Sequence, residues 1–258
     1  MKPDFLYNPL SQGENRLPQR AYYIPYGEKK YAVNRQVGSN ERYISMNGEW
    51  KFSYFETPLD LPDSVEAIEF QDTIPVPSCW ECYGYGQIQY TNINYPFPVN
   101  VPYTKTVNPV GVYSRVIDVE AMPGLPHSYM VFEGVSAALE LYINGEYVGA
   151  SKGSRMQAEF EVSGFLHNGA NTVTVLVYTF CDGSYLEDQD CFRYHGIFRD
   201  VYILKRPQNH VRDFTVITST DGTICVKSDA DELTLTVFDC SGNVLASGKD
   251  ECRISDPV

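Results

Sequence analysis

The stretch that decides the fold class is Leu139-Glu140-Leu141-Tyr142-Ile143-Asn144-Gly145-Glu146-Tyr147-Val148-Gly149. Its first five residues alternate between apolar side chains and the side chains of Glu140 and Tyr142, which is the two-residue period of a β-strand. Asn144-Gly145 follows, and this pair is the strongest short hairpin signal in the sequence, because both residues tolerate the positive φ angles of a tight two-residue turn. The stretch therefore predicts two antiparallel strands.

The same pattern of short apolar or alternating runs continues on both sides of this hairpin. Further strands are predicted at residues 50–55, 112–119, 128–135, 160–162, 172–180 and 201–204. Residues 172–180 are apolar on both faces, as a central buried strand should be. No stretch longer than about ten residues shows convincing helical periodicity. The pattern is typical of an all-β sandwich.

The chain divides into three predicted parts. Residues 1–40 lack periodicity but are rich in tyrosine, so we expect an ordered arm packed on the first domain. Residues 41–207 form the first sandwich, with a boundary near Lys205-Arg206-Pro207-Gln208-Asn209. Residues 208–258 contain short strand patterns at 214–218, 223–227 and 233–239, too few to close a second sandwich. We therefore expect a fragment of a longer protein.

Composition narrows the classes of function. The formal net charge is −13, which argues against a nucleic-acid partner and against an anionic membrane surface. The N-terminus has no signal-like apolar run and no window approaches a membrane span, so we expect a cytoplasmic protein. Seven scattered cysteines predict no disulfide framework. Cys79 and Cys82 have the spacing of a redox or zinc motif, but no second pair accompanies them, and reduced structural cysteines are the default.

The most unusual stretch is Asp182-Gly183-Ser184-Tyr185-Leu186-Glu187-Asp188-Gln189-Asp190, with four carboxylates in nine residues. A self-contained glycosidase pair of Asp188 and Asp190 is disfavoured, because one loop rarely supplies both groups that flank a glycosidic bond. A salt-bridged loop neutralised by Arg193 or Arg199 remains an alternative. The third interpretation is a polar pocket in which carboxylates bind sugar hydroxyls or a hard cation.

Residues 79–111 form the least regular part of the chain and combine many tyrosines with glycines and prolines. A loop of this length in a compact domain is usually functional or disordered, and its aromatic content argues against disorder. Covering one end of the sandwich is the alternative role. Elsewhere the motifs of serine hydrolases, zinc proteases, phosphate loops and dinucleotide sites are absent from the sequence.

Several motifs together carry a family resemblance. They are Asn47-Gly48-Glu49-Trp50-Lys51-Phe52, Val76-Pro77-Ser78-Cys79-Trp80-Glu81, Tyr90-Thr91-Asn92-Ile93-Asn94-Tyr95-Pro96, Asn108-Pro109-Val110-Gly111-Val112-Tyr113, Phe132-Glu133-Gly134-Val135, the acidic stretch 182–190, and residues 196–201. With these motifs in this order, the chain resembles the N-terminal sugar-binding region of a family 2 glycoside hydrolase, close to the large cytoplasmic β-galactosidases.

The resemblance implies a jelly-roll, galactose-binding-like β-sandwich followed by the first part of an immunoglobulin-like β-sandwich. It places the catalytic glutamates and a magnesium ion in a barrel outside this chain, so no catalytic residue is expected here. It implies that Asn92 and Asp190 bind the substrate and that Asp190 is also a ligand of a sodium ion. The implied partner is a β-galactoside such as lactose, and the full-length protein is expected to form a homo-oligomer.

The sequence departs from the family where Cys191 and Phe192 replace the common Met-Trp and where His195 replaces a small residue. These changes put the packing of the loop in doubt more than its acids. Two alternatives stay open: a stand-alone carbohydrate-binding sandwich, or a family 2 β-glucuronidase or β-mannosidase. The 258-residue chain by itself is expected to be inactive and to hold no metal tightly.

Overall fold

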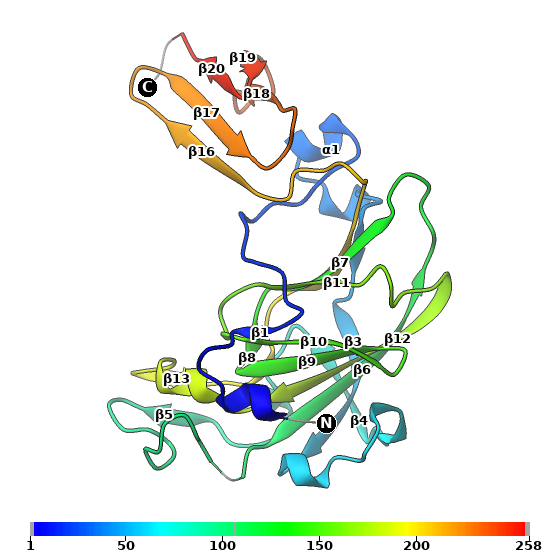
Figure 1. Ribbon diagram of the computed structural model, residues 1–258, viewed down its shortest axis with the longest axis vertical. Coiled ribbons are helices and arrows are strands. Elements are labelled where there is room, and N and C mark those ends of the chain that lie inside the picture. The colour runs from blue at the N-terminus through cyan, green and yellow to red at the C-terminus, as the bar shows by residue number, and fades with distance from the viewer. Residues whose placement is uncertain (1–2, 106, 256–258) are drawn as a thin grey trace. The chain divides into compact units, whose positions relative to one another are not determined.

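The computed structural model describes residues 3–105 and 107–255, and most of its regular structure is β-strand (Figure 1). The strands are β1 (Gly13–Glu14), β2 (Tyr43–Ser45), β3 (Gly48–Phe55), β4 (Asp72–Val76), β5 (Gln89–Thr91), β6 (Val110–Val119), β7 (His127–Phe132), β8 (Val135–Ser136), β9 (Ala138–Ile143), β10 (Glu146–Lys152), β11 (Ala158–Glu161), β12 (Gly169–Tyr178), β13 (Cys191–Arg193), β14 (Gly196–Ile197), β15 (Val201–Arg206), β16 (Phe214–Thr218), β17 (Thr223–Ser228), β18 (Thr234–Phe238), β19 (Val244–Lys249) and β20 (Glu251–Arg253).

Helical structure is confined to short pieces. They are α1 (Lys29–Val33) and the 3-10 turns η1 (Pro3–Tyr7), η2 (Val37–Ser39), η3 (Pro58–Asp60), η4 (Val65–Ala67), η5 (Trp80–Tyr83) and η6 (Asp182–Tyr185). Within the described residues, no helix has the length and apolar character needed to cross a membrane. The prediction of an all-β sandwich is confirmed.

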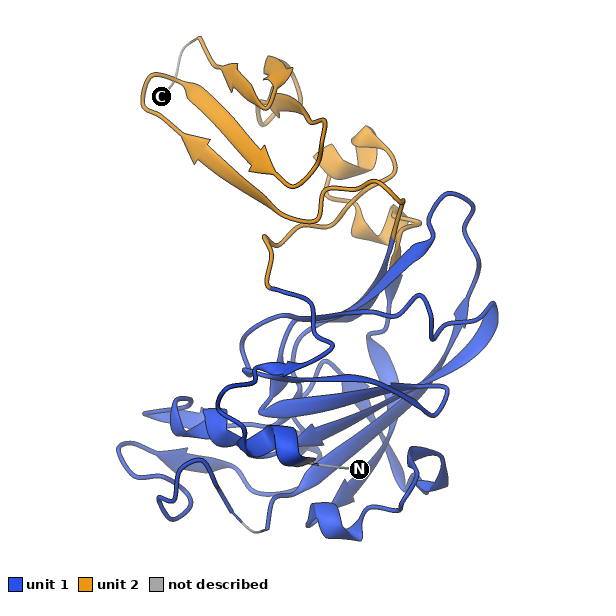
Figure 2. Ribbon diagram, in the orientation of Figure 1, with its two compact units in different colours: residues 1–18, 44–205 blue, residues 19–43, 206–258 orange. Residues whose placement is uncertain are grey.

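The chain forms two compact units (Figure 2). Unit 1 contains residues 3–18 and 44–205, and unit 2 contains residues 19–43 and 206–255. The predicted ranges 1–40, 41–207 and 208–258 divide the chain differently. The physical reason is a set of contacts over long sequence separation: the Ala21 amide donates to Asp213 over 2.8 Å, and the Tyr23 ring lies 5.4 Å from Phe214. No local pattern in the sequence shows these contacts.

Unit 1 is built from two sheets, of which the larger is antiparallel throughout. The larger has seven strands in the order β1-β10-β9-β12-β6-β3-β4, and the smaller has four in the order β11-β7-β15-β2. A core of buried side chains draws on strands of both sheets, including Trp50 of β3, Val175 of β12, Phe132 of β7 and Ile203 of β15. The predicted strand 172–180 corresponds to β12, which pairs with β9 and β6 on its two sides.

The hairpin between β9 and β10 has the geometry that its turn sequence predicts. Asn144 has φ 53° and Gly145 has φ 83°, so both turn residues lie in the left-handed region. Ile143 and Glu146 are the paired residues on either side of the turn. Positive φ at both positions defines the turn type whose twist matches that of the flanking strands.

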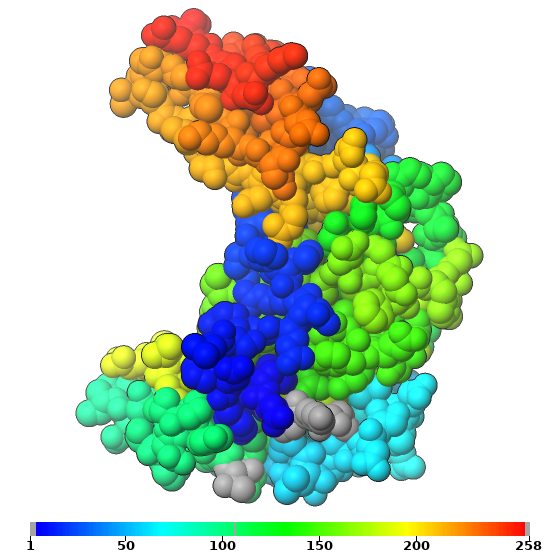
Figure 3. All heavy atoms as spheres, viewed as in Figure 1, coloured from blue at the N-terminus to red at the C-terminus, as the bar shows by residue number. Residues whose placement is uncertain are grey.

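The outer face of the large sheet is also largely buried, by the start of the chain and by the region around η4. Phe5 and Leu6 of η1 belong to a second apolar cluster with Leu176 and Tyr178 of β12. In the space-filling view, the dark blue N-terminal segment lies on the surface of unit 1 (Figure 3). Burial on both faces explains why β12 lacks the polar alternation of a strand with one solvated face.

Burial of this second face encloses a carboxylate, that of Glu140 on β9. The residue is 2% exposed and accepts hydrogen bonds from Tyr142 over 2.7 Å and Tyr178 over 2.9 Å. Burial raises the pKa of Glu140, while the two tyrosine hydroxyls oppose that rise. The strand alternation predicts which face Glu140 shares with Tyr142, but not that the N-terminal segment covers that face.

Unit 2 consists of α1 and two small antiparallel sheets. One sheet has the order β16-β17-β20, and the other pairs β18 with β19. The predicted strands at 214–218, 223–227 and 233–239 match β16, β17 and β18 to within a residue or two. Few apolar side chains of this unit are buried, among them Val226 and Cys252.

We expect the stability of unit 1 to fall as pH rises because of Glu140. The raised pKa means that the folded state keeps a proton that the unfolded chain releases above its ordinary pKa of about 4.3, so the unfolded state gains stability over that window. Glu140→Gln should therefore exceed the original protein in melting temperature by a margin that widens from pH 4 to pH 7. Tryptophan fluorescence can follow this, because both tryptophans, Trp50 and Trp80, lie buried in unit 1.

Glu146→Gln is the matched control, because Glu146 is exposed on the neighbouring strand. Its melting temperature should run parallel to that of the original protein across the same pH series. A margin for Glu140→Gln that stays constant with pH would contradict the assignment.

Candidate functional site

A short ladder between β5 and β13 brings the two predicted site residues together. Cys191 pairs with Thr91 in this ladder, so Asp190 and Asn92 lie just beyond the same end. The backbone amide of Asp190 donates to the carbonyl of Thr91 over 3.1 Å and to that of Asn92 over 3.3 Å. Residues 98 positions apart in the chain thus become direct neighbours.

Asp190 presents its carboxylate at the surface. The residue is exposed and has φ 56°, a left-handed conformation in which aspartate is better tolerated than most side chains. The Tyr90 hydroxyl donates to Oδ1 of Asp190, and this hydrogen bond raises the pKa of Tyr90. Asn92 is also exposed. Within residues 3–105 and 107–255, its side chain makes no hydrogen bond and Asp190 makes no ion pair.

Asp188 faces the protein instead. Its side chain is 6% exposed, and Oδ1 lies 2.6 Å from Nη2 of Arg155 while Oδ2 lies 3.7 Å from Nη1 of Arg193. Burial lowers the pKa of Arg193, and the charge of Asp188 opposes that change. Of the two arginines suggested by the sequence, Arg193 therefore contacts the acidic loop. Arg199 donates to the backbone carbonyl of Arg155 over 3.3 Å.

The other two acids of the loop are also held. Asp182 forms an ion pair of 2.8 Å with Lys152, and both side chains are nearly buried. Glu187 accepts from the amide of Ser154 over 2.8 Å and from its hydroxyl over 2.6 Å. Partners within the protein thus hold three of the four acids in a structural role, which is the alternative interpretation of this stretch. Asp190 is the exception.

Residues 79–111, here called the aromatic loop, are anchored to the acidic loop, residues 182–190, through Tyr185 of η6. The Tyr185 hydroxyl donates to the carbonyl of Tyr103 over 2.6 Å and accepts from the amide of Asn100 over 2.9 Å. Its ring packs against Tyr95 at 5.0 Å and Phe97 at 5.1 Å between centroids. Sequence reasoning assigned no role to Tyr185, although an aromatic residue in the middle of an acidic stretch was a usable signal.

His195, which departs from the family pattern, fills a buried position. Its Nδ1 lies 2.6 Å from Oε1 of Glu81, and its backbone amide donates to Oε2 over 3.0 Å. The ring stacks on Trp80 with centroids 5.7 Å apart. The larger residue therefore gains a specific set of partners, and it ties the connection after β13 to the aromatic loop.

The remaining candidates for metal or redox chemistry have little support. Burial raises the pKa of the Cys79 thiol to about 11, which disfavours a reactive thiolate. In the described parts of the chain, no three His, Cys, Asp or Glu side chains gather closely enough to hold a metal ion. What the site offers is an exposed carboxylate, an exposed amide and neighbouring tyrosines, a set suited to hydrogen-bonding sugar hydroxyls.

Comparison with known proteins identifies the family to which this all-β sandwich belongs. Residues 43–207 match the model of the sugar-binding domain of the glycosyl hydrolases family 2. The chain belongs to this family. It is 42% identical over 214 residues to a β-galactosidase of Actinobacillus pleuropneumoniae and 43% identical over 221 residues to one of Staphylococcus xylosus. These matches cover 83% and 85% of the chain but only 21% and 22% of the relatives.

Solved structures share the fold at lower sequence identity. A Faecalibacterium prausnitzii β-glucuronidase superposes with a TM-score of 0.63 at 18% identity, covering 85% of this chain and 42% of that one. A Ruminococcus gnavus β-glucuronidase gives 0.64 at 15% identity, with 85% and 39% covered. At these identities the likeness supports the β-sandwich fold and carries nothing about substrate.

We expect His195→Ala to destabilise unit 1 by about 2–4 kcal/mol, because it leaves a cavity beside Trp80 and removes the imidazole partner of the buried Glu81 carboxylate, which then keeps only the backbone amide of residue 195. Urea unfolding followed by tryptophan fluorescence measures the change. His127→Ala is the matched control: its contact with Glu161 spans 2.9 Å and is more exposed than that of His195 with Glu81, so a cost below about 1 kcal/mol is expected. Equal costs for the two variants would contradict a specific role for His195.

Proposed function

We propose that this chain is the N-terminal sugar-binding part of a retaining β-galactosidase, and that Asn92 and Asp190 bind the substrate. The observation that supports this most directly is their adjacency at the end of the β5–β13 ladder, with both side chains exposed. The relatives named β-galactosidase add support through 41–43% identity over most of the chain. In this proposal the reacting groups belong to a catalytic barrel outside the chain.

A sodium ion at the subsite is part of the proposal, with Asp190 as one ligand. The residues fit this role partially: Asp190 offers a hard carboxylate oxygen that no cationic side chain of the described residues neutralises. A hard cation needs several oxygen ligands, and this chain supplies too few of them alone. The remaining ligands, and a magnesium ion, are proposed to belong to the barrel.

The charge of the site favours a neutral galactoside such as lactose over a glucuronide. The glucuronate carboxylate would face Asp190 with no intervening cationic side chain, and like charges at a subsite cost binding energy. A stand-alone carbohydrate-binding module is the other class of function. Hydrolysis of a galactoside by the full-length protein would contradict that alternative. Cytoplasmic location and assembly into a homo-oligomer are proposed on the family resemblance alone.

In the full-length protein, Asp190→Asn should lower kcat/KM for a chromogenic β-galactoside on the order of 100-fold, because a displaced substrate or cation loses alignment with the reacting groups. The dependence of the rate on sodium, at constant ionic strength, should weaken as well. Asp118→Asn, which changes an exposed acid on β6, is the control and should leave both quantities unchanged. Unaltered kinetics in Asp190→Asn would overturn the assignment.

The 258-residue chain by itself should neither hydrolyse a galactoside nor bind galactose tightly. A subsite that lacks most of its walls does not offset the free-energy cost of immobilising a ligand. Incubation of the purified chain with a chromogenic galactoside, and calorimetric titration with galactose, measure the two quantities. Turnover that persists after a further purification step would contradict the location of the reacting groups outside this chain.

A further inference from the structure

The acidic loop is held by one short segment on the neighbouring hairpin. Lys152 is the last residue of β10, and Ser154 and Arg155 follow within three positions. These three residues contact the three inward-facing acids of the loop in matching order: Lys152 with the first acid, Ser154 with Glu187, and Arg155 with Asp188. The site residue Asp190 is the fourth acid and lies two residues beyond the last of these contacts.

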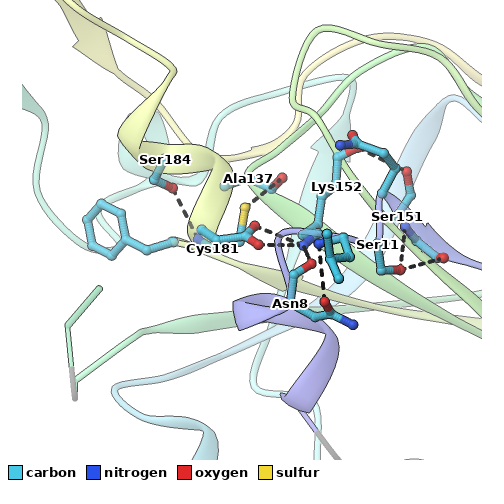
Figure 4. A network of polar contacts seen from close by, with 12 residues as sticks. Asn8, Ser11, Ala137, Ser151, Lys152, Cys181 and Ser184 are labelled. Atoms are coloured by element: carbon cyan, nitrogen blue, oxygen red, sulfur yellow. Dashed lines mark hydrogen bonds and ion pairs between the residues drawn. The ribbon is translucent and has the colours of Figure 1, made fainter. Parts of the chain in front are cut away.

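Lys152 occupies the most buried of the three contacts. Its side chain is 5% exposed and that of Asp182 is 9% exposed. The ammonium nitrogen lies 2.8 Å from each carboxylate oxygen of Asp182 and 3.0 Å from the backbone carbonyl oxygen of Asn8. Figure 4 shows Lys152 between Asn8 and the turn that contains Cys181 and Ser184. Three acceptors thus match the three donors of an ammonium group. Removing the charge alone would leave a buried carboxylate unpaired.

The N-terminal segment holds Lys152 from the other side. The amide of Lys152 donates to the carbonyl of Gln12 over 2.9 Å, and its carbonyl accepts from Nη1 of Arg16 over 2.9 Å. Between these two contacts, β1 pairs with β10 in close approach: a Cβ atom on Gly149 would lie 2.5 Å from the carbonyl oxygen of Glu14. Residues 8–16 and the end of β10 therefore form one tightly packed structure.

Asp182 connects Lys152 to the acidic loop, because Asp182 is the first residue of η6. The turn is closed locally, since the amide of Cys181 donates to the Ser184 hydroxyl over 3.1 Å and the amide of Ser184 donates back to the Cys181 carbonyl over 3.0 Å. The same turn carries Tyr185, whose hydroxyl holds the aromatic loop. A shift of Asp182 would therefore move both loops that carry the proposed sugar-binding residues.

We propose that Lys152 is a positioning residue, whose ammonium group joins the N-terminal segment to the base of the acidic loop and thereby places Asp190. The effect on catalysis that this inference predicts rests on the proposed function. The contacts by which Lys152 fixes the acidic loop are a structural property that does not depend on that function. The positioning role of Lys152 gives residues 8–16 a part in building the sugar site, although none of them lies at it.

The test compares Lys152→Met with the original sequence in the full-length protein. We expect kcat/KM for a chromogenic galactoside to fall about 10-fold to 100-fold, since small misplacements of a binding group are costly. The sodium concentration for half-maximal activity should rise about 10-fold. Hydrogen exchange measured by mass spectrometry should quicken in peptides covering 182–190 and 5–16, which a general loss of stability would not single out.

Lys205→Met is the matched control, because Lys205 is also 5% exposed and lies in unit 1 but, within the described residues, forms no hydrogen bond or ion pair with the acidic loop. It should leave the sodium response and the exchange of these two segments unchanged, whatever it does to the melting temperature. Should Lys152→Met fail to fold, Lys152→Met combined with Asp182→Leu removes both charges and avoids the unpaired carboxylate. That double variant should fold and still show faster exchange in 182–190.

Identical sodium responses and identical exchange in Lys152→Met and Lys205→Met would overturn the inference. Faster exchange with unchanged kinetics would overturn the positioning role, because the loop would then move without consequence for the reaction. If Asp190→Asn leaves hydrolysis unaltered, the proposed function fails by itself. The exchange measurements then still decide whether Lys152 holds the loop, so the two failures are distinguishable.

Discussion

Four carboxylates within nine residues repel one another, and the architecture of the site follows from how that repulsion is relieved. Asp182, Glu187 and Asp188 turn toward the protein, where an ammonium group, a backbone amide with a hydroxyl, and two guanidinium groups receive them. Asp190 is left at the surface with the Tyr90 hydroxyl as its partner. Carboxylates in a single loop thus have different roles, because three of them turn inward to partners within the protein, as burial of a charge requires, and Asp190 does not.

The same constraint connects the loop to the whole of unit 1. The groups that receive the acids come from the last residue of β10, from the segment that follows it and from β13, and β10 is held in turn by the N-terminal segment. That segment also covers the outer face of the large sheet, where Phe5 and Leu6 pack beside β12. The burial of Glu140 is a consequence of this covering. The N-terminal segment therefore contributes both to the packing of unit 1 and to the construction of the site.

The sequence predicted much of the fold, since local rules govern the features concerned. Alternation located β9, a run that is apolar on both faces located β12, and Asn144-Gly145 indicated the turn between β9 and β10. The division into units was not predictable in the same way, because residues 19–43 belong with 206–255 only through contacts such as that of Tyr23 with Phe214. Short strands such as β1 and β5 also escaped prediction, since two or three residues show no period.

For the site, the sequence alone determined which residue types are available, and family resemblance singled out Asn92 and Asp190 from among them. Tertiary structure decided which acids are neutralised, because that depends on the neighbours each carboxylate meets. The sequence offered Arg193 and Arg199 as partners, whereas folding brought Arg193 and Arg155 to Asp188. Charge pairing acts over a few ångströms in space, and residues 33 positions apart in the chain become partners only when the strands between them have paired.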